Sequence, residues 1–296
     1  MGYMHIENLD RPKGQRLLLF REVYGLEKVF GTSACVSWRQ GALRLSSYGA
    51  DRAEFLKFFD QERLADAFKR LGRDSVDVHG EAYGGKEQGQ SGRYGNELRF
   101  IAFDVKIGDL WLAVPAAHQV SESLGLEFVP YRKVSTDMDA LRALRDEPSE
   151  VAQRRGIAKP VDREGIVLHP LIELRANDGE RLVAKFKGRM FSERKTFHDS
   201  PEGAQRTQAL SDAEAIAEEW VTEMRLTRVL QHLRAVVIAA PQPPFTVKDS
   251  PCVAAVMLAD VLREASGEIV ESKEAERAIK RRAVALFQAW LKGSAT

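Results

Sequence analysis

The sequence is poor in the features that mark secreted, zinc-binding and membrane proteins. Only two cysteines, Cys35 and Cys252, occur among 296 residues, and they lie far apart. The sequence has no Cys-x-x-Cys pair and no Cys/His cluster, which argues against a disulfide framework and a structural zinc site. The longest apolar runs, at residues 235–240 and 252–259, are far shorter than the roughly 20 residues that a membrane helix needs.

Targeting signals and a strong net charge are also lacking. The first residues have neither the basic and apolar segments of a signal peptide nor a Ser or Thr that would mark Gly2 for myristoylation. We therefore expect a soluble, cytoplasmic protein with reduced thiols. The formal net charge is only +1, so any affinity for nucleic acid must come from a local basic patch.

The composition is that of a globular protein, with 44% hydrophobic and 29% charged residues. The length fits one large domain or two modest ones. A polar stretch at residues 196–211, which contains Pro201 and Gly203, predicts a boundary between two domains, 1–200 and 211–296.

The first domain is predicted to be rich in strands, and the second to be helical. Apolar alternation and turn residues predict strands at residues 16–23, 34–38, 42–46, 75–81, 98–105, 164–168, 171–175 and 181–186. Apolar residues at helical spacing predict helices at 51–71, 115–125 and 138–146, with a loop at 83–96. Later helices are expected from a capping box at Ser211 and Glu214, through residues 253–265, and around Ile279, Ala283, Leu286 and Trp290.

Five short blocks carry the residue types that nucleotide chemistry uses. They are residues 27–33, 76–81, 100–105, 163–168 and 183–187. The first block holds Lys28 three residues before Gly31. A lone Lys-x-x-Gly occurs by chance in many chains, so taken alone Lys28 would be interpreted as a surface lysine. In the last block, Lys185 and Lys187 are two residues apart in a predicted strand, so both face one side and form an anion site.

Taken together and in order, these blocks resemble the lysine-dependent nucleotidyltransferases, and within them the RNA ligase 2-like ATP-dependent RNA ligases. The resemblance spans roughly residues 16–195. The matching motifs are Lys28-Val29-Phe30-Gly31-Thr32, Gly80-Glu81, Phe103-Asp104, Glu164-Gly165-Ile166-Val167, and the pair Lys185 and Lys187. The resemblance implies an α+β fold, with an antiparallel-sheet nucleotidyltransferase (adenylyltransferase) core followed by a small all-α C-terminal domain.

The resemblance also implies a role for each matching residue. Lys28 is the nucleophile that attacks ATP; Glu81 binds the ribose, and Glu164 lies near the metal, Mg²⁺ or Mn²⁺, and the reacting phosphate. Phe103 and Val167 sandwich the adenine, although a core position would explain Phe103 equally well. The lysine pair binds phosphates, and Glu27 and Gly31 complete the predicted nucleotide site. The chemistry is consistent, since a phosphoramidate needs a lysine amine, and neighbouring cations favour its neutral form.

Two features depart from the family pattern. The family usually has histidine where this chain has Phe30, and that histidine contributes to catalysis in relatives. A further motif usually carries an arginine, and here only Arg44 and Arg52 flank the corresponding stretch.

The predicted function is ATP-dependent sealing of RNA that has 3′-hydroxyl and 5′-phosphate ends, through a lysyl-AMP intermediate. Two alternatives stay open. The chain could be a non-catalytic nucleotide- or RNA-binding module of ligase descent, a hypothesis that rests on Phe30. It could also be a DNA ligase or a capping-type nucleotidyltransferase, but these usually append an OB-fold, and the C-terminal part here does not resemble five short strands. No protein partner is evident.

Basic residues gather in two stretches. One surrounds the lysine pair and suits phosphates: Arg181, Lys185, Lys187, Arg189, Arg194 and Lys195. The other lies on the last predicted helix: Arg277, Lys280, Arg281 and Arg282. A solvated helix face is the simpler interpretation of the second stretch, with contact to RNA as the alternative.

Overall fold

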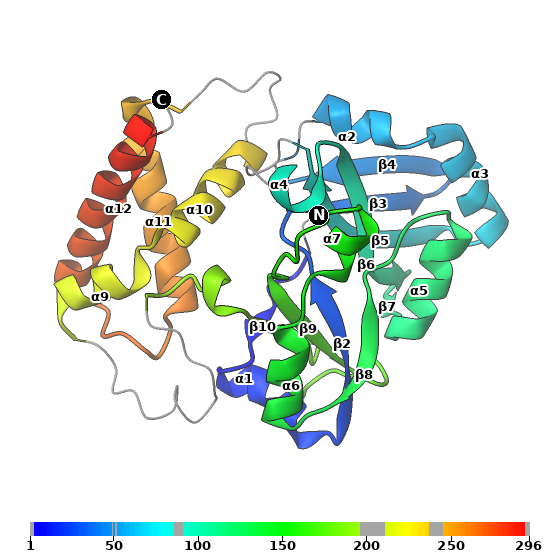
Figure 1. The fold of residues 1–296 in the computed structure, drawn as a ribbon, viewed down its shortest axis with the longest axis horizontal. Coiled ribbons are helices and arrows are strands. Elements are labelled where there is room, and N and C mark those ends of the chain that lie inside the picture. The colour runs from blue at the N-terminus through cyan, green and yellow to red at the C-terminus, as the bar shows by residue number, and fades with distance from the viewer. Residues whose placement is uncertain are drawn as a thin grey trace. The chain divides into compact units, whose positions relative to one another are not determined.

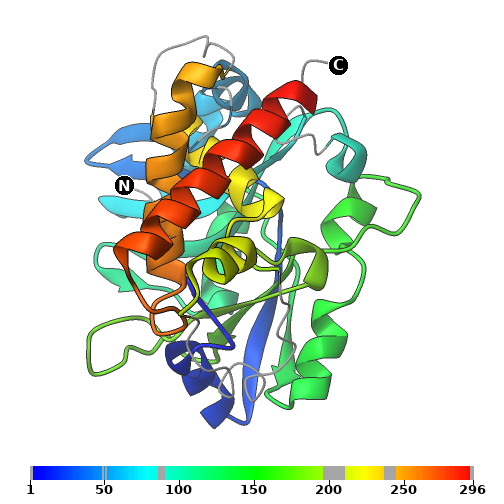
Figure 2. The same cartoon turned by 90° about the vertical axis from the view of Figure 1, so that its left-hand side faces the viewer.

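The computed structural model describes residues 3–48, 50, 52–85, 91–195, 211–236 and 245–293. The chain divides into two compact units, Met1–Gly188 and Arg189–Thr296 (Figures 1 and 2). Most of the predicted boundary stretch, residues 196–210, lies outside the described residues, so the boundary itself stays a prediction.

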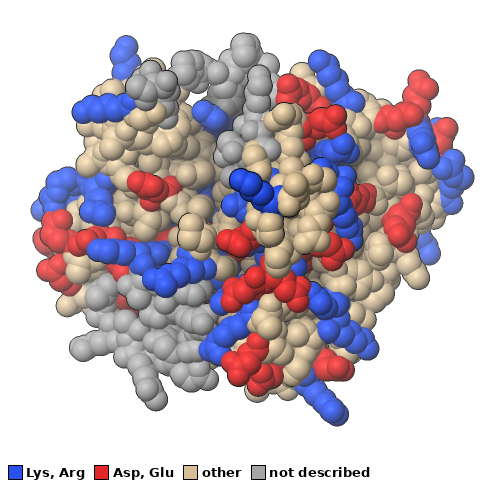
Figure 3. Space-filling view, in the orientation of Figure 1, with Lys and Arg blue, Asp and Glu red and all other residues tan. Residues whose placement is uncertain are grey.

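The surface carries charges of both signs. On the face drawn in Figure 3, basic and acidic side chains are interspersed, which agrees with the net charge of +1. Within the part of the chain that the structure describes, no helix is long and apolar enough to span a membrane.

The first sheet of the first unit has the strand order β1-β10-β9-β2-β8. Its strands are β1 (Glu7–Asn8), β10 (Ala184–Lys187), β9 (Gly165–Pro170), β2 (Glu22–Lys28) and β8 (Tyr131–Ser135). All neighbouring strands run antiparallel except β1 and β10, which are parallel. The predicted antiparallel sheet therefore has one parallel edge.

The second sheet is antiparallel throughout, in the order β4-β3-β5-β6-β7. Its strands are β4 (Ala42–Ser47), β3 (Thr32–Arg39), β5 (Ser75–Gly84), β6 (Leu98–Ile107) and β7 (Leu110–Trp111). The predicted hairpin between β3 and β4 is present. Its two turn residues, Gln40 and Gly41, have φ values of 48° and 84°, as a tight two-residue hairpin turn requires.

Helices cover one face of each sheet. On the first sheet, Ile166 and Leu168 of β9 pack with Leu141 and Leu144 of α6 (Met138–Arg145). The core of this face also includes Leu17 of the short 3₁₀ helix η1 (Arg16–Leu19), which follows α1 (Pro12–Gln15). These contacts bury the apolar face of the sheet.

Beside the second sheet lie α2 (Arg52–Phe58) and α3 (Gln61–Leu71) (Figure 1), and both contribute aromatic side chains to its core. Phe55 packs edge-on against Phe100 of β6, and Phe68 stacks on Trp38 of β3. The described part of the unit also contains α4 (Ser91–Tyr94), α5 (Val114–Ser123) and α7 (Glu150–Arg154).

Several predicted boundaries are wrong. Residues 16–19 form η1 rather than the start of a strand. The single helix predicted at 51–71 is two helices, because Asp60 accepts a hydrogen bond from the backbone of Arg63 and so begins a second one. The strand expected at 171–175 is reduced to one bridge between Arg175 and Arg181. Strand β8 and helix α7 were not predicted.

The described part of the second unit contains helices and no strand. The helices are η3 (Arg189–Phe191), α9 (Ala213–Trp220), α10 (Glu223–Val236), η4 (Val247–Asp249), α11 (Ser250–Glu264) and α12 (Lys273–Gly293). The cap of α9 is Asp212, which accepts from the backbone of Ala215, and not Ser211 as predicted.

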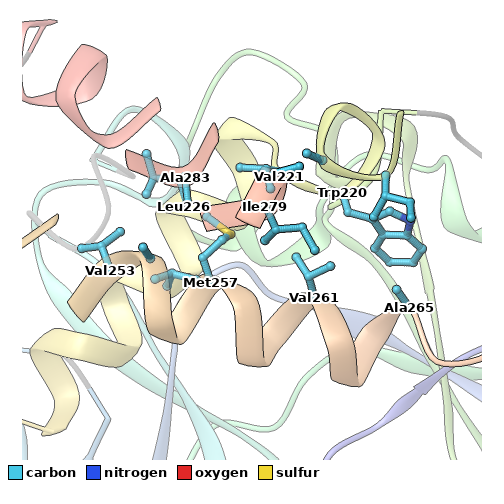
Figure 4. Close-up of a cluster of buried hydrophobic side chains, with 14 of the residues drawn as sticks. Trp220, Val221, Leu226, Val253, Met257, Val261, Ala265, Ile279 and Ala283 are labelled. Carbon is cyan, nitrogen blue, oxygen red and sulfur yellow. The ribbon is translucent and has the colours of Figure 1, made fainter. Parts of the chain in front are cut away.

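The second unit has its own apolar core. Met257 and Val261 of α11 lie beside Ile279 and Ala283 of α12, and Trp220 of α9 closes one end (Figure 4). All the fully buried residues of this cluster belong to residues 216–287. The helices therefore bury their apolar faces against one another, as the predicted helical spacing requires.

Candidate functional site

Lys28 ends strand β2, and the sheet register places it in a row with two other predicted site residues. It lies opposite Gly165 of β9, and Gly165 in turn lies opposite Lys187 of β10. Directly opposed residues of antiparallel strands present their side chains on the same face. Three blocks that are distant in sequence therefore meet at one end of the first sheet.

Glu164 joins the two lysines of this row. One carboxylate oxygen, Oε2, lies 2.9 Å from Nζ of Lys28, and Oε1 lies 3.5 Å from Nζ of Lys187. The side chain of Glu164 is only 1% exposed, and those of Lys28 and Lys187 are 17% and 9% exposed. A buried carboxylate is costly without partners, and here two ammonium groups compensate it.

Gly165 makes this close arrangement possible. Its φ is 151°, and a Cβ there would lie 2.3 Å from the carbonyl oxygen of Phe186 and 2.7 Å from Cα of Lys187. A side chain would therefore push β10 away from β9 and carry Lys187 away from Glu164. The backbone N–H of Gly188 adds a 2.9 Å hydrogen bond to the carbonyl oxygen of Glu164.

Val167 and Lys185 lie one pleat further along the same face. Leu26 of β2, Val167 and Lys185 are opposite one another in the register, two residues from the row of Lys28. Val167 and Lys185 are half-buried. The predicted shared face of Lys185 and Lys187 is thus present, and it is the face that carries Lys28.

The turn after Lys28 packs against strand β5 at Glu81. A Cβ at Gly31 would lie 2.4 Å from the carbonyl oxygen of Ala82 and 2.7 Å from Cγ of Glu81. Only glycine permits so close an approach. Phe30 is buried, and its backbone N–H donates to the hydroxyl of Tyr94 at 3.3 Å. Burial raises the pKa of Tyr94 well above its ordinary value, so this hydroxyl stays protonated.

Phe103 occupies a β-bulge. His79 of β5 pairs with Asp104, but the next residue, Gly80, pairs with Ala102, so Phe103 is an extra residue in β6. Bulges redirect side chains and are frequent beside functional sites. Phe103 is half-buried, which leaves part of its ring accessible.

The backbone of residues 127–130 connects the two sheets beside this bulge. The N–H of Ala102 donates to the carbonyl oxygen of Glu127 at 2.7 Å, and the N–H of Val129 donates to that of Ala102 at 2.9 Å. On the other side, the N–H of Glu27 donates to the carbonyl oxygen of Pro130 at 2.9 Å. Phe103 and Lys28 therefore each lie one residue from this connection.

Glu27 does not join the row of Lys28. Its carboxylate accepts hydrogen bonds from the hydroxyl of Ser149 and from the backbone N–H groups of Glu150 and Val151, at the start of α7. Burial raises the pKa of Glu27, against the opposing effect of these hydrogen bonds. Its role in nucleotide binding stays a prediction; the contact seen here anchors α7 to β2.

The predicted metal ligand, Glu164, is buried between the amines of Lys28 and Lys187. In the described ranges, no group of three or more His, Cys, Asp or Glu side chains could hold a metal ion. A single carboxylate nevertheless fits a magnesium-type ion that arrives with a nucleotide, because Mg²⁺ is often held by one or two carboxylates together with substrate phosphates.

Two groups of contacts around the site were not predicted. Tyr94 and Ser149 hold the segments on either side of Lys28, and neither lies in one of the five blocks. Arg181 binds Asp104 across 77 positions of sequence. Ser149 follows a proline and precedes Glu150, which is a helix-start signal that could have revealed α7. Nothing in the local sequence indicates the pairing of Arg181.

Comparison with solved structures finds RNA ligases from Naegleria gruberi. The ligase with PPi is 16% identical, with a TM-score of 0.51, over 64% of this chain and 57% of that chain. A variant of that ligase with ATP and Mn gives the same four values, and a variant with AMP and Mn gives 15% and 0.50 over the same shares. No protein-family profile matches the sequence, and no curated protein matches it.

The fold is similar to that of an RNA ligase. This chain matches less than two thirds of the length of those ligases, and at 16% identity the likeness concerns the fold alone. It confirms a mixed α+β architecture with antiparallel sheets and C-terminal helices.

Proposed function

We propose that this chain is an ATP-dependent RNA ligase of the RNA ligase 2-like kind, and that it carries AMP covalently on Lys28. The observation that supports the proposal most directly is the row of Lys28, Gly165 and Lys187, with the carboxylate of Glu164 between the two amines. The similarity of the fold to an RNA ligase agrees with it.

In the first step, the amine nitrogen of Lys28 attacks the α-phosphorus of ATP. A nitrogen–phosphorus bond forms, the bond to the bridging oxygen of the β-phosphate breaks, pyrophosphate leaves, and the amine loses a proton. Lys185 and Lys187, on the same face, neutralise charge on the phosphates. Val167 and Phe103 provide flat apolar surfaces for the adenine, and Glu81, against which Gly31 packs, accepts from the ribose.

Glu164 lies where it can bind both the nucleophile and a cation. Its carboxylate is 2.9 Å from Nζ of Lys28 and 3.5 Å from Nζ of Lys187, so another cation that engages Glu164 competes directly with Lys28. A divalent ion held by Glu164 and the nucleotide would be such a cation, and it would polarise the phosphates. In this arrangement Glu164 is a shared partner of the nucleophile and of the arriving substrate.

The next two steps transfer AMP to RNA and seal the break. A 5′-phosphate oxygen of the RNA attacks the phosphorus of lysyl-AMP, the nitrogen–phosphorus bond breaks, and Lys28 recovers a proton. A 3′-hydroxyl then attacks the activated 5′-phosphorus, loses its proton, and displaces AMP. Phe30, in place of the family histidine, is buried and offers no polar side chain for these steps.

A binding module of ligase descent is the alternative from a different class. The direct contact between Lys28 and Glu164 argues against a binding module, because a protein that only binds nucleotide needs no nucleophile. A DNA ligase or capping enzyme is disfavoured because the described part of the second unit is helical.

The test is covalent labelling. Incubation of the full chain with ATP and Mg²⁺ or Mn²⁺ should add the mass of one adenylate, and Lys28→Ala should abolish the adduct. The matched control is Lys133→Ala, an exposed lysine on the same face of the sheet, which should label normally. An adduct that persists in Lys28→Ala would show that the nucleophile is elsewhere. No adduct in the native chain would favour the binding module.

The base is tested in the same assay. ATP should label Lys28 much more efficiently than GTP, because the resemblance is to adenylating enzymes. Equal labelling by GTP would instead favour a capping-type activity.

A further inference from the structure

A buried cluster of charged and aromatic residues has no role in the proposed reaction steps. Arg181, in the segment before β10, donates from Nη1 to Oδ2 of Asp104 at 2.6 Å and to the hydroxyl of Tyr3 at 3.1 Å. The hydroxyl of Tyr3 also donates to Oδ2 of Asp104 at 2.6 Å. The other side of the guanidinium binds the carboxylate of Glu173 from Nε and Nη2.

The ion pair at the centre of the cluster is almost closed to solvent. The side chains of Arg181 and Asp104 are each 2% exposed. The guanidinium also lies 4.0 Å from the ring centroid of Trp111, which adds a cation–π contact. Burial and the neighbouring carboxylate of Asp104 raise the pKa of Tyr3, so its hydroxyl remains a donor. Charges buried this completely are expensive to desolvate, which makes their geometry restrictive.

The cluster connects the two sheets at the positions that the proposed nucleotide site depends on. Asp104 follows the bulged residue Phe103 in the second sheet, and Arg181 precedes Lys185 by four residues in the first. The ring of Tyr3 also packs edge-on against Phe103, with centroids 4.9 Å apart. One set of contacts therefore holds both the ring of Phe103 and the strand that carries the lysine pair.

We propose that Tyr3, Asp104 and Arg181 form a clamp that positions Phe103 for the base of the bound nucleotide, so that they determine affinity for the nucleoside part of ATP. The inference rests on the proposed function, since it takes the nucleotide to lie against Phe103. The three residues are positioning residues, which take no part in bond making. Tyr3 packs against Phe103, Asp104 follows Phe103 in the chain, and Arg181 lies in the segment leading to β10.

The test measures self-adenylation as a function of ATP concentration in Tyr3→Phe, Asp104→Asn and Arg181→Gln. The clamp predicts that Asp104→Asn and Arg181→Gln raise KM for ATP roughly tenfold, with kcat much less affected, because a loosened ring loses stacking on the base. Tyr3→Phe keeps the ring and should have a smaller effect in the same direction. Inorganic triphosphate, which lacks a base, should inhibit all variants as well as it inhibits the native chain.

Arg145→Gln is the matched control. Arg145 is also a buried arginine, paired with Asp146 and lying 4.4 Å from the ring centroid of Phe186, but it belongs to α6 on the opposite face of the first sheet. The substitution Arg145→Gln should lower the melting temperature without changing KM for ATP. All assays are run at a temperature where circular dichroism shows each variant folded.

The outcomes separate the two proposals. If the native chain forms no adenylate, the proposed function fails and the clamp fails with it. If the native chain reacts but Asp104→Asn and Arg181→Gln keep a native KM, the clamp alone is wrong. If these two do not fold, Tyr3→Phe decides, and an unchanged KM in it overturns the proposal. If a variant weakened the binding of ATP and the inhibition by inorganic triphosphate equally, the clamp would also be wrong, because the substitution would then affect phosphate binding.

Discussion

The two faces of the first sheet are built by the same strands but have opposite character. On one face, Ile166, Leu168 and Phe186 pack with α6 and form a closed apolar core. On the other face, one residue along each strand, lie Lys28 and Lys187 with the carboxylate of Glu164 between them. A register shift of one residue would exchange the two sets, so the core also fixes which side chains can perform chemistry.

The comparison teaches that the apolar core and the proposed reactive face are separated by the pleat of the sheet rather than by distance. A change on the apolar face should alter folding and leave the reaction of folded molecules intact. A change on the lysine face should do the reverse. The following predictions test this separation, from the largest expected effect to the smallest.

Removal of either lysine of the pair should reduce self-adenylation by roughly a hundredfold or more, the scale of losing one electrostatic contact to a reacting group. The variants are Lys185→Ala and Lys187→Ala, and the rate of lysyl-AMP formation is the measurement. Lys133→Ala, on exposed β8, is the control and should be unaffected. Near-normal rates in both site variants would show that the pair does not bind phosphates.

On the opposite face, Leu168→Ala should lower the free energy of unfolding by about 2–5 kcal/mol, because Leu168 is fully buried and truncation leaves a cavity. Urea denaturation measures this. At low temperature, where the variant is folded, its rate of self-adenylation should equal that of the native chain. A large loss of rate in folded molecules would mean that the two faces are coupled.

The face of the sheet that carries Lys28 also contains a buried residue, His169. It lies opposite Tyr24 on that face, yet it is fully buried, and burial lowers its pKa to about 3. The unfolded chain binds this proton near pH 6.5 and the folded chain does not, so stability is present above pH 6.5 and falls as the pH decreases towards 3.

For His169 alone, the free energy of unfolding at pH 5 should be about 2 kcal/mol lower than at pH 7. Denaturation curves of the native chain and of His169→Gln at both pH values measure this change in the free energy of unfolding. The change between pH 7 and pH 5 should be smaller in His169→Gln than in the native chain. Replacement of the exposed His232 of α10 is the control. The same pH dependence in the native chain and His169→Gln would show that other groups cause it.

The smallest effect concerns the second unit. If exposed Arg277 and Lys280 of α12 contact RNA phosphates, their joint replacement by alanine should weaken RNA binding severalfold and reduce its salt dependence by roughly one unit of slope per residue. Self-adenylation should not change. Lys248→Ala, an exposed lysine of η4, is the control. Unchanged binding in the double variant would favour a solvated helix face.

The sequence predicted the mixed α+β architecture and the shared face of Lys185 and Lys187 because both depend on short patterns. The period of two in residues 183–187 was enough to place Lys185 and Lys187 on one face, and the order of the blocks brought Lys28 and Glu164 to the same site. Strand β8 was missed because Tyr131–Ser135 is an edge strand with exposed charges and little apolar alternation. The division of one long helix at Asp60 was missed because apolar spacing continues through the cap.

Contacts between distant segments could not be predicted in the same way. The bulge at Phe103 appears only when β5 and β6 are aligned residue by residue, and no glycine or proline marks it. Glu27 lies beside Lys28 in the first block, yet its partner is the start of α7, more than a hundred residues later. A single sequence shows which polar residues are present, but not which of them pair when they are buried.

The closed core of the second unit has a consequence for how such a chain can diversify. Trp220, Met257 and Phe287 belong to one apolar cluster, and the fully buried members of this cluster all come from the described part of the second unit. A helical unit of this kind can be replaced, lengthened or redesigned without rebuilding the strands that hold Lys28. Evolution, or an engineer, can therefore vary the helices as a module while the row of Lys28, Gly165 and Lys187 stays unchanged.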